Sequence, residues 1–271
     1  MKKKMNIINS TLDDILYCSY SIQLLNNLLS IYEFRSLLII SKKVNLTLLD
    51  FIKKIKYNDT GNQLIDLSKY KSLINLDLRH FHFKDKLVNE NHKLLFLNLY
   101  NTNIASLSNT FCSLKILNLR NSKFNNFKSI KLPSLKKLYL RSTKITNLND
   151  IKYNCNLNLL DIGHTDISCL EPLKEIKLNY LFVDCTKINR LSEIYTIKFI
   201  NLRKISNLDI FNIDKFINIK HIDLRSTKFN NFDMLKKLGH NVIVYLNSSF
   251  IKNLDITIDI SEYKCKLFFS N

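Results

Sequence analysis

Arginine side chains recur at matching places along this chain. Its composition favours Lys over Arg, with 41 basic residues of which only seven are Arg, so composition does not explain their spacing. Guanidinium groups grip carboxylates through paired hydrogen bonds, and Tyr and Phe are enriched in protein interfaces. The recurring positions carry Arg79, Arg120, Arg141, Arg203 and Arg225, with Phe96, Tyr100, Tyr139, Tyr180, Phe182 and Tyr245 beside them. This combination predicts recognition of an acidic protein surface.

A repeated phrase positions these side chains. Between Leu73 and Leu254 the pattern apolar-x-x-apolar-x-apolar-x-x-Thr/Ser-x-apolar-x-x-apolar occurs nine times, in steps of 19 to 22 residues. Its clearest copy runs from Leu135 to Leu148. A period near twenty is the signature of a solenoid, in which each repeat packs only on its neighbours. Such a fold favours an extended binding surface over a catalytic pocket.

The middle of each phrase alternates apolar and polar residues, which predicts a short strand. Stacked copies form a parallel sheet, and the outward residues line up in columns two, four and six places before the Thr position. The first column holds the arginines, the second is rich in Asp and Asn, and the third is aromatic and aliphatic. About eight residues return to the next strand, which predicts short helical or 3-10 turns on the convex side.

The phrase resembles the leucine-rich repeat family, L-x-x-L-x-L-x-x-N-x-L, with Thr or Ser in place of the family Asn. Its short period is similar in style to leucine-rich repeat families of AT-rich parasites and insect poxviruses. The resemblance implies an α/β fold, a right-handed horseshoe-shaped solenoid with a concave parallel sheet and an N-terminal helical cap. Phe81 and Ile205 replace the Thr, so we expect local irregularities there.

Two roles remain open for the arginine column. An arginine can pair with an acid on its own or an adjacent strand, as Arg225 could with Asp223, and so serve only the sheet. Arg120 and Arg141 have Asn118 and Tyr139 as flanking residues rather than acids, which makes them the best candidates for gripping a partner. A stripe of lysines after the Thr position would help to steer an acidic partner.

The termini complete the predicted organisation. Residues 1–45 should form a helical cap, residues 46–254 the solenoid, with clear repeats from 73, and residues 255–271 a capping strand. Ile256, Ile258 and Ile260 alternate with polar residues as a strand would. Segments near Leu12 and from Glu33 resemble an F-box, without its usual Pro and with longer spacing. That resemblance implies an alternative function, a substrate receptor of a ubiquitin ligase.

Composition narrows the remaining function classes. The net charge of +18 admits a second alternative, nucleic-acid binding, although AT-rich coding accounts for much of the lysine and does not favour it. Three glycines cannot build a phosphate loop, and the six scattered cysteines and six histidines have no spacing that indicates a metal site. We therefore expect no enzyme activity, cofactor, metal or membrane span, and an intracellular, cytoplasmic location.

Overall fold

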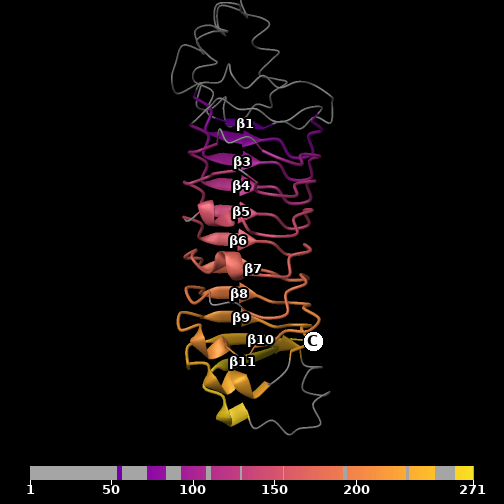
Figure 1. Ribbon diagram of the computed structural model, residues 1–271. Coiled ribbons are helices and arrows are strands. Elements are labelled where there is room, and N and C mark those ends of the chain that lie inside the picture. Colours follow the sequence, from indigo (N-terminus) through magenta and orange to yellow (C-terminus); the bar gives the residue numbers. More distant parts are fainter. Residues whose placement is uncertain are drawn as a thin grey trace, which may run out of the picture.

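The chain winds into a stack of short parallel strands. The computed structural model describes residues 54–56, 72–83, 93–107, 111–128, 130–154, 156–191, 194–210, 212–229, 232–247 and 260–270. In this part of the chain eleven strands form one sheet, and each pairs in parallel with the next (Figure 1). They are β1 (Lys54–Lys56), β2 (Asn75–Asp77), β3 (Phe96–Asn98), β4 (Ile116–Asn118), β5 (Lys137–Tyr139), β6 (Leu159–Asp161), β7 (Tyr180–Phe182), β8 (Phe199–Asn201), β9 (His221–Asp223), β10 (Ile243–Asn247) and β11 (Lys266–Ser270).

Burial of an apolar side chain at its centre fixes each strand from β2 to β10 in place. In the nine repeats of the sequence pattern, the middle residue of the phrase is at most 2% exposed, as with Leu138 in β5 and Leu160 in β6. These middle residues pair with each other from strand to strand. A slip of one residue would turn the whole apolar set toward solvent, so the register is strongly specified.

The Thr position closes a turn at the end of each strand. The hydroxyls of Thr102, Thr143, Thr165 and Thr186 donate to the carbonyl oxygen three residues earlier, at 2.6 to 2.8 Å. The residue just before this position has a left-handed backbone in eight repeats, with φ between 53° and 64°. There its N–H donates to a carbonyl of the next repeat, as Asn101 does to Arg120 at 2.8 Å. The turns therefore extend the hydrogen-bond ladder beyond the strands.

The two expected irregularities turn out differently. At Phe81 the turn is kept, because its N–H donates to the Leu78 carbonyl at 3.1 Å and its ring is buried. At Ile205 no hydroxyl is available, and Thr227 of the next repeat substitutes for it. The Thr227 hydroxyl donates to the carbonyl of Leu202 and accepts the N–H of Ile205. One threonine thus serves two repeats.

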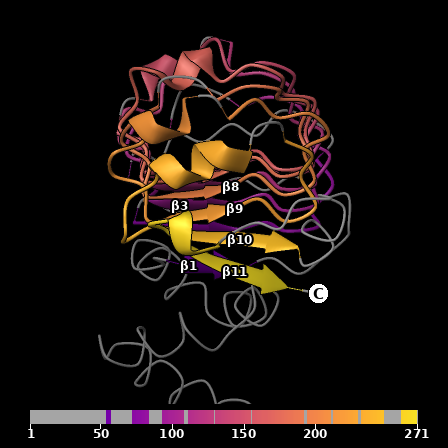
Figure 2. The same ribbon diagram turned by 90° about the horizontal axis from the view of Figure 1, so that it is seen from below.

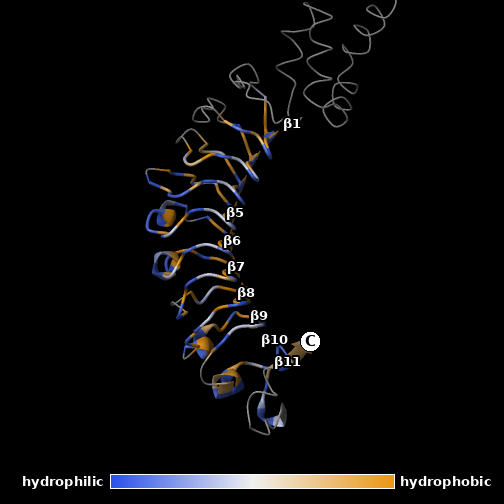
Figure 3. Cartoon of the chain, turned by 90° about the vertical axis from the view of Figure 1, so that its right-hand side faces the viewer, coloured by the Kyte–Doolittle hydropathy of each residue, from blue (hydrophilic) through white to orange (hydrophobic). Residues whose placement is uncertain are grey.

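The return segments lie on the opposite side of the core from the sheet. Four short 3-10 helices occur there, η1 (Ile151–Tyr153), η2 (Glu171–Leu173), η3 (Ile213–Lys215) and η4 (Phe232–Lys237) (Figure 2). Seen from the side, the stack curves with the strands on its concave side and these helices on its convex side (Figure 3). This arrangement confirms the expected concave sheet and convex 3-10 turns. Among the helical segments that are described, none has the length and apolar character to cross a lipid bilayer.

The predicted domain boundaries, after residues 45 and 254, lie outside the described residues. The proposed cap and F-box-like segment at residues 1–45 lie outside the described residues, while β1 falls within the predicted solenoid. Of the alternating isoleucines, Ile256 and Ile258 also lie outside, and Ile260 begins the 3-10 helix η5 (Ile260–Glu262) instead of a strand. The C-terminal strand is β11, which pairs with β10 over five residues.

Candidate binding face on the concave sheet

The outward side chains of the strands form one continuous face. Strand pairing aligns the three predicted columns, so that Tyr180 of β7 lies opposite Phe199 of β8, and Phe199 lies opposite His221 of β9. All the predicted site residues lie on or directly after strands β2 to β10, at outward positions, and none of them is fully buried. The predicted site residues therefore lie on one surface. Their contacts differ from one repeat to the next.

The Asp/Asn column holds the ends of the strands. The Oδ1 atoms of Asn98, Asn118, Asp161 and Asn201 accept the backbone N–H two residues further on, at 3.1 to 3.2 Å. Short polar side chains close such turns because they satisfy a nearby amide without help from another segment. This column is therefore part of the scaffold, and it also supplies carboxylates to the arginines.

Arg79 and Arg225 each pair with the Asp two residues before them. Arg79 Nη2 lies 2.6 Å from Asp77 Oδ2, and Arg225 Nη2 lies 2.7 Å from Asp223 Oδ2. Burial alone would raise the pKa of Asp77, but the hydrogen bonds and charge of Arg79 outweigh it and lower that pKa. The pKa of Arg79 is raised by the same contact. The sequence left open whether these arginines pair with an acid of their own strand or bind a partner. At both positions the structure shows pairing within the repeat.

Arg120 and Arg141 form an ion network with Asp161 and Asp184, which corrects the expectation that they lack acidic neighbours. Arg120 reaches across β5, with its guanidinium 4.4 Å from the centre of the Tyr139 ring, and its Nη2 lies 2.6 Å from Asp161 Oδ2 on β6. Arg141 contacts Asp161 at 3.4 Å and grips both oxygens of Asp184, at 2.8 and 2.5 Å. Asp161 lies two repeats beyond Arg120 and one beyond Arg141, and Asp184 lies two repeats beyond Arg141, so flanking residues alone cannot reveal these pairs.

Gly163 makes room for this network. It occupies the arginine column on the repeat of β6, between Arg141 and Asp184. A Cβ built on Gly163 would lie 2.6 Å from Arg141 Nη2 and 2.8 Å from Asp184 Oδ1. Since real Cβ atoms do not approach so closely, any side chain here would displace the guanidinium. Glycine fits here because the Arg141 and Asp184 side chains occupy the space that a Cβ would need.

Arg203 differs from the other arginines of the column. Its neighbour in the column on the preceding repeat is Asp184, whose Oδ1 already accepts from Arg141 and from Asn201 Nδ2. Arg203 has no ion pair within the described residues, and its Nε is buried without a hydrogen-bond partner there. The buried Nε thus lacks an acceptor, and the charge of the guanidinium lacks a counter-ion among the described residues.

An aromatic row covers the C-terminal half of the face. The Phe182 and Phe199 ring centres are 5.3 Å apart, and those of Tyr245 and Phe268 are 5.8 Å apart. Tyr180 is 42% exposed and Phe268 51%. The row consists of Tyr180, Phe182, Phe199, His221, Tyr245 and Phe268. The repeated phrase did not predict Phe268, because β11 lies beyond the ninth copy of the phrase.

The predicted lysine stripe lies at the edge of the sheet, where each strand ends. All four of its members are exposed, and they are Lys123, Lys144, Lys187 and Lys228. Lys187 Nζ lies 2.6 Å from Asp166 Oδ1, and this contact lowers the pKa of Asp166. The stripe is therefore a solvated basic edge rather than a buried charge cluster.

Comparisons with known proteins point to one fold. Internalin C2 of Listeria monocytogenes is 22% identical, with a TM-score of 0.55 over 74% of this chain and 84% of that one. The functional domain of InlJ from the same organism is 18% identical, with a TM-score of 0.53 over 75% of this chain and 50% of that one. The TLR13 chain of a TLR13–ssRNA13 complex is 19% identical, with a TM-score of 0.53 over 72% of this chain and 30% of that one.

One curated protein is similar to part of this chain in sequence. Toll-like receptor 2 of Macaca fascicularis is 36% identical over 94 residues, which are 34% of this chain and only 12% of that protein. No family model matches the chain. The solved structures are each less than 25% identical to this chain, so they show a shared fold only. The kind of partner must therefore be inferred from the surface of this chain.

Proposed function

We propose that this chain, a leucine-rich repeat protein, is a non-catalytic module that binds a protein partner on the C-terminal half of its concave sheet. The proposal depends on one observation above all, the aromatic row beside Arg203. A solenoid offers an extended concave surface of this kind for recognition. Soluble proteins rarely leave adjoining aromatic side chains half-exposed unless something contacts them.

The residue types of this half suit a protein interface. Tyr, Phe and Arg are enriched in protein interfaces. The aromatic rings bury large areas with few rotamers to fix, and Arg adds paired hydrogen bonds to acidic groups. Tyr180 and Phe199 supply partly exposed rings, while Arg203 adds a cation that no described carboxylate neutralises. A partner with an acidic group beside apolar side chains would satisfy both features.

The other half of the face supports the proposal by contrast. The guanidinium groups of Arg120 and Arg141 already bind carboxylates, so a partner would have to displace Asp161 or Asp184 to use them. Displacing a paired carboxylate exchanges one ion pair for another and gains little. We therefore place the main contact around Arg203 and propose that the lysine stripe steers an acidic partner toward it.

The test uses the full chain and matched pairs of substitutions. A double variant, Tyr180→Ser with Phe199→Ser, removes two rings of the aromatic row. The control, Phe96→Ser with Tyr100→Ser, removes two outward rings from the N-terminal half. Partners captured from cells by the wild type are identified by mass spectrometry, and their affinity for purified chain is then measured.

We expect a partner that the first variant binds at least about tenfold more weakly and the control binds as the wild type does. Equal loss in both variants would place the contact across the whole face. Unchanged binding in both would contradict the proposal and move the site away from the concave sheet.

Nucleic-acid binding is the second candidate, since the chain carries a net charge of +18 and the exposed lysine stripe. Retention on single-stranded RNA and duplex DNA, measured across a salt series, separates this candidate from the first. A phosphate-binding chain loses affinity steeply as salt rises. Binding that persists at physiological salt, and that is lost when the lysine stripe is changed to Gln, would replace the protein partner with nucleic acid.

We also propose a reducing compartment for this chain. Of the cysteines that the structure describes, Cys169, Cys185 and Cys265 are free thiols, and Cys169 is exposed. Exposed thiols persist where glutathione and thioredoxin keep them reduced. Counting free thiols in chain isolated under alkylating conditions tests the proposal, and disulfides among these cysteines would contradict it.

A further inference from the structure

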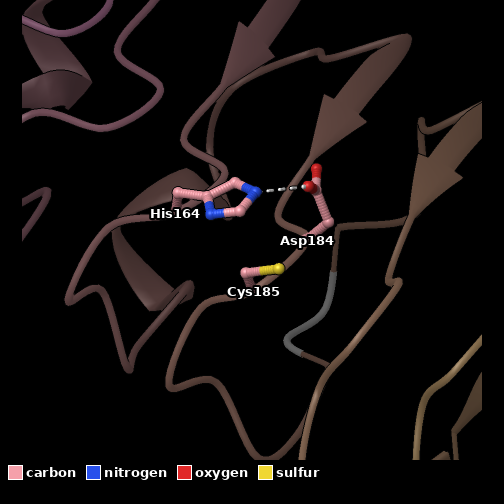
Figure 4. A group of neighbouring side chains, drawn as sticks. All are labelled: His164, Asp184 and Cys185. Carbon is pink, nitrogen blue, oxygen red and sulfur yellow. Dashed lines mark ion pairs between the residues drawn. The ribbon is translucent and has the colours of Figure 1, made fainter.

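Three side chains of types that can bind a metal lie close together at one edge of the concave face. His164 and Cys185 follow strands β6 and β7, and Asp184 directly precedes Cys185 (Figure 4). The Nε2 atom of His164 lies 3.6 Å from Asp184 Oδ2. One ligand atom from each of the three residues lies within 4.8 Å of the other two.

The repeat architecture brings these residues together. His164 and Cys185 both occupy the left-handed position before the Thr, with φ of 54° and 55°. The N–H of His164 donates to the carbonyl of Asp184 at 2.8 Å, which holds the two turns side by side. The other described left-handed positions carry His80, Asn101, Asn121, Ser142, Lys204 and Ser226. Among the described turns, a His and a Cys are neighbours only here.

We propose that His164, Asp184 and Cys185 bind a divalent metal ion of the zinc class. Imidazole nitrogen, carboxylate oxygen and thiolate sulfur are the donors that zinc takes, whereas calcium and magnesium prefer oxygen alone. Two zinc bonds of about 2.0–2.1 Å at a tetrahedral angle separate their donor atoms by roughly 3.4 Å. The His164–Asp184 separation is close to that value. A longer Zn–S bond of about 2.3 Å sets the separations from Cys185 Sγ at about 3.6 Å, so these donor pairs need to close by about 1.2 Å at most.

The site is open to solvent on one side. The His164 side chain is 50% exposed, so water can occupy the fourth coordination position. Three protein ligands and one exchangeable position are typical of reactive zinc sites, whereas structural sites are closed by four protein ligands. A donor atom from a partner could replace that water at the edge of the binding face.

Arg141 limits the affinity of this site without blocking it. Its guanidinium binds both oxygens of Asp184, and its positive charge opposes that of an incoming cation. Arg141 also contacts Asp161 at 3.4 Å, so it keeps a carboxylate partner when Asp184 turns toward a metal. Each carboxylate oxygen has two lone pairs, so Asp184 can accept hydrogen bonds from Arg141 and bind a metal ion at the same time. We expect weaker binding than at a closed zinc site.

Cobalt(II) provides the test, because a cobalt–thiolate bond gives a charge-transfer absorption that shows sulfur ligation directly. The full chain is titrated with Co²⁺ under reducing conditions. The variants are His164→Asn and Cys185→Ser, which place residues that already fill the same turn position at Asn101 and Ser142. The controls are His82→Gln and Cys169→Ser, which remove an exposed His and an exposed Cys outside the site.

We expect one thiolate-bound Co²⁺ in the wild type and in both controls, displaced by Zn²⁺. Either variant should weaken binding by more than the roughly 10–100-fold that losing a hydrogen-bonded partner of a ligand costs. Zn²⁺ should raise the melting temperature of the wild type and not that of His164→Asn. Absorption that survives in Cys185→Ser, or no thiolate absorption in the wild type, would overturn the proposal.

Discussion

The two halves of the concave face use similar residue types in different ways. Over β4 to β7 the ion network pairs two arginines with two acids, and Asp161, at its centre, is 2% exposed. Over β7 to β11 the face carries the aromatic row and Arg203, whose Nε has no partner in the part of the chain described. The same repeat thus pairs both arginines of the network in one half, and in the other it pairs Arg225 with Asp223 but leaves Arg203 Nε without a partner among the described residues. An arginine column by itself does not mark a binding site, and what matters is whether its own or a neighbouring repeat supplies a carboxylate.

Loss of Asp161 should give the largest effect on stability. Arg120 and Arg141 share this carboxylate, so Asp161→Ala leaves two partly buried cations with fewer acceptors. We expect a loss of about 2–3 kcal/mol in the free energy of unfolding, below the value for a fully buried pair because both arginines reach solvent. Urea denaturation measures this loss. Asp166→Asn, at an exposed ion pair, serves as the control and should leave the transition where it is.

A methyl group at Gly163 should break the same half by steric means. The added Cβ pushes the flexible end of the Arg141 side chain away from Asp184, and we expect Gly163→Ala to cost up to about 1 kcal/mol. In an Arg141→Ala background most of this cost should vanish, because the displaced guanidinium is gone. Gly239→Ala is the matched control, since a Cβ there meets nothing within 4 Å. Additive costs in the double variant would show that Gly163 has another role.

Acid should weaken the pair of Arg79 with Asp77 by a smaller amount. The pKa of Asp77 lies below its ordinary value of 3.8, so the pair contributes stability above about pH 4 and loses it as pH falls through the lowered pKa. Arg79 is 44% exposed, which limits the contribution to less than about 1 kcal/mol. The stability difference between the wild type and Arg79→Gln should therefore shrink from pH 6 to pH 3. A constant difference would mean that Arg79 acts through packing instead.

Arg203→Gln should have the smallest effect on stability and a clear effect on binding. Removing a buried Nε that lacks a partner should leave the free energy of unfolding unchanged or raise it by no more than about 0.5 kcal/mol. Affinity for the captured partner should fall, whereas Arg225→Gln should lower stability through the loss of its pair with Asp223. If Arg203→Gln destabilised the chain as much as Arg225→Gln, the proposed contrast between the halves would be wrong.

Periodicity in the sequence was sufficient for the fold. One buried apolar residue per strand sets the register, and a hydroxyl or its substitute closes each turn, so each strand from β2 to β10 could be predicted from its own repeat. The same periodicity placed every candidate site residue on one face. The location of β11 could not be predicted in this way, because the C-terminal segment departs from the phrase.

Only the tertiary structure decided which side chains on that face are satisfied. An arginine side chain is long enough to pass its nearest strand, so Arg120 and Arg141 select acids two repeats away when Tyr139 and Gly163 allow it. The left-handed turns likewise bring His164 beside Cys185, 21 positions apart in the chain. The sequence by itself determined the columns, because burial of apolar side chains is periodic. The partners within and between columns depend on side-chain reach and local space, which only the folded stack supplies.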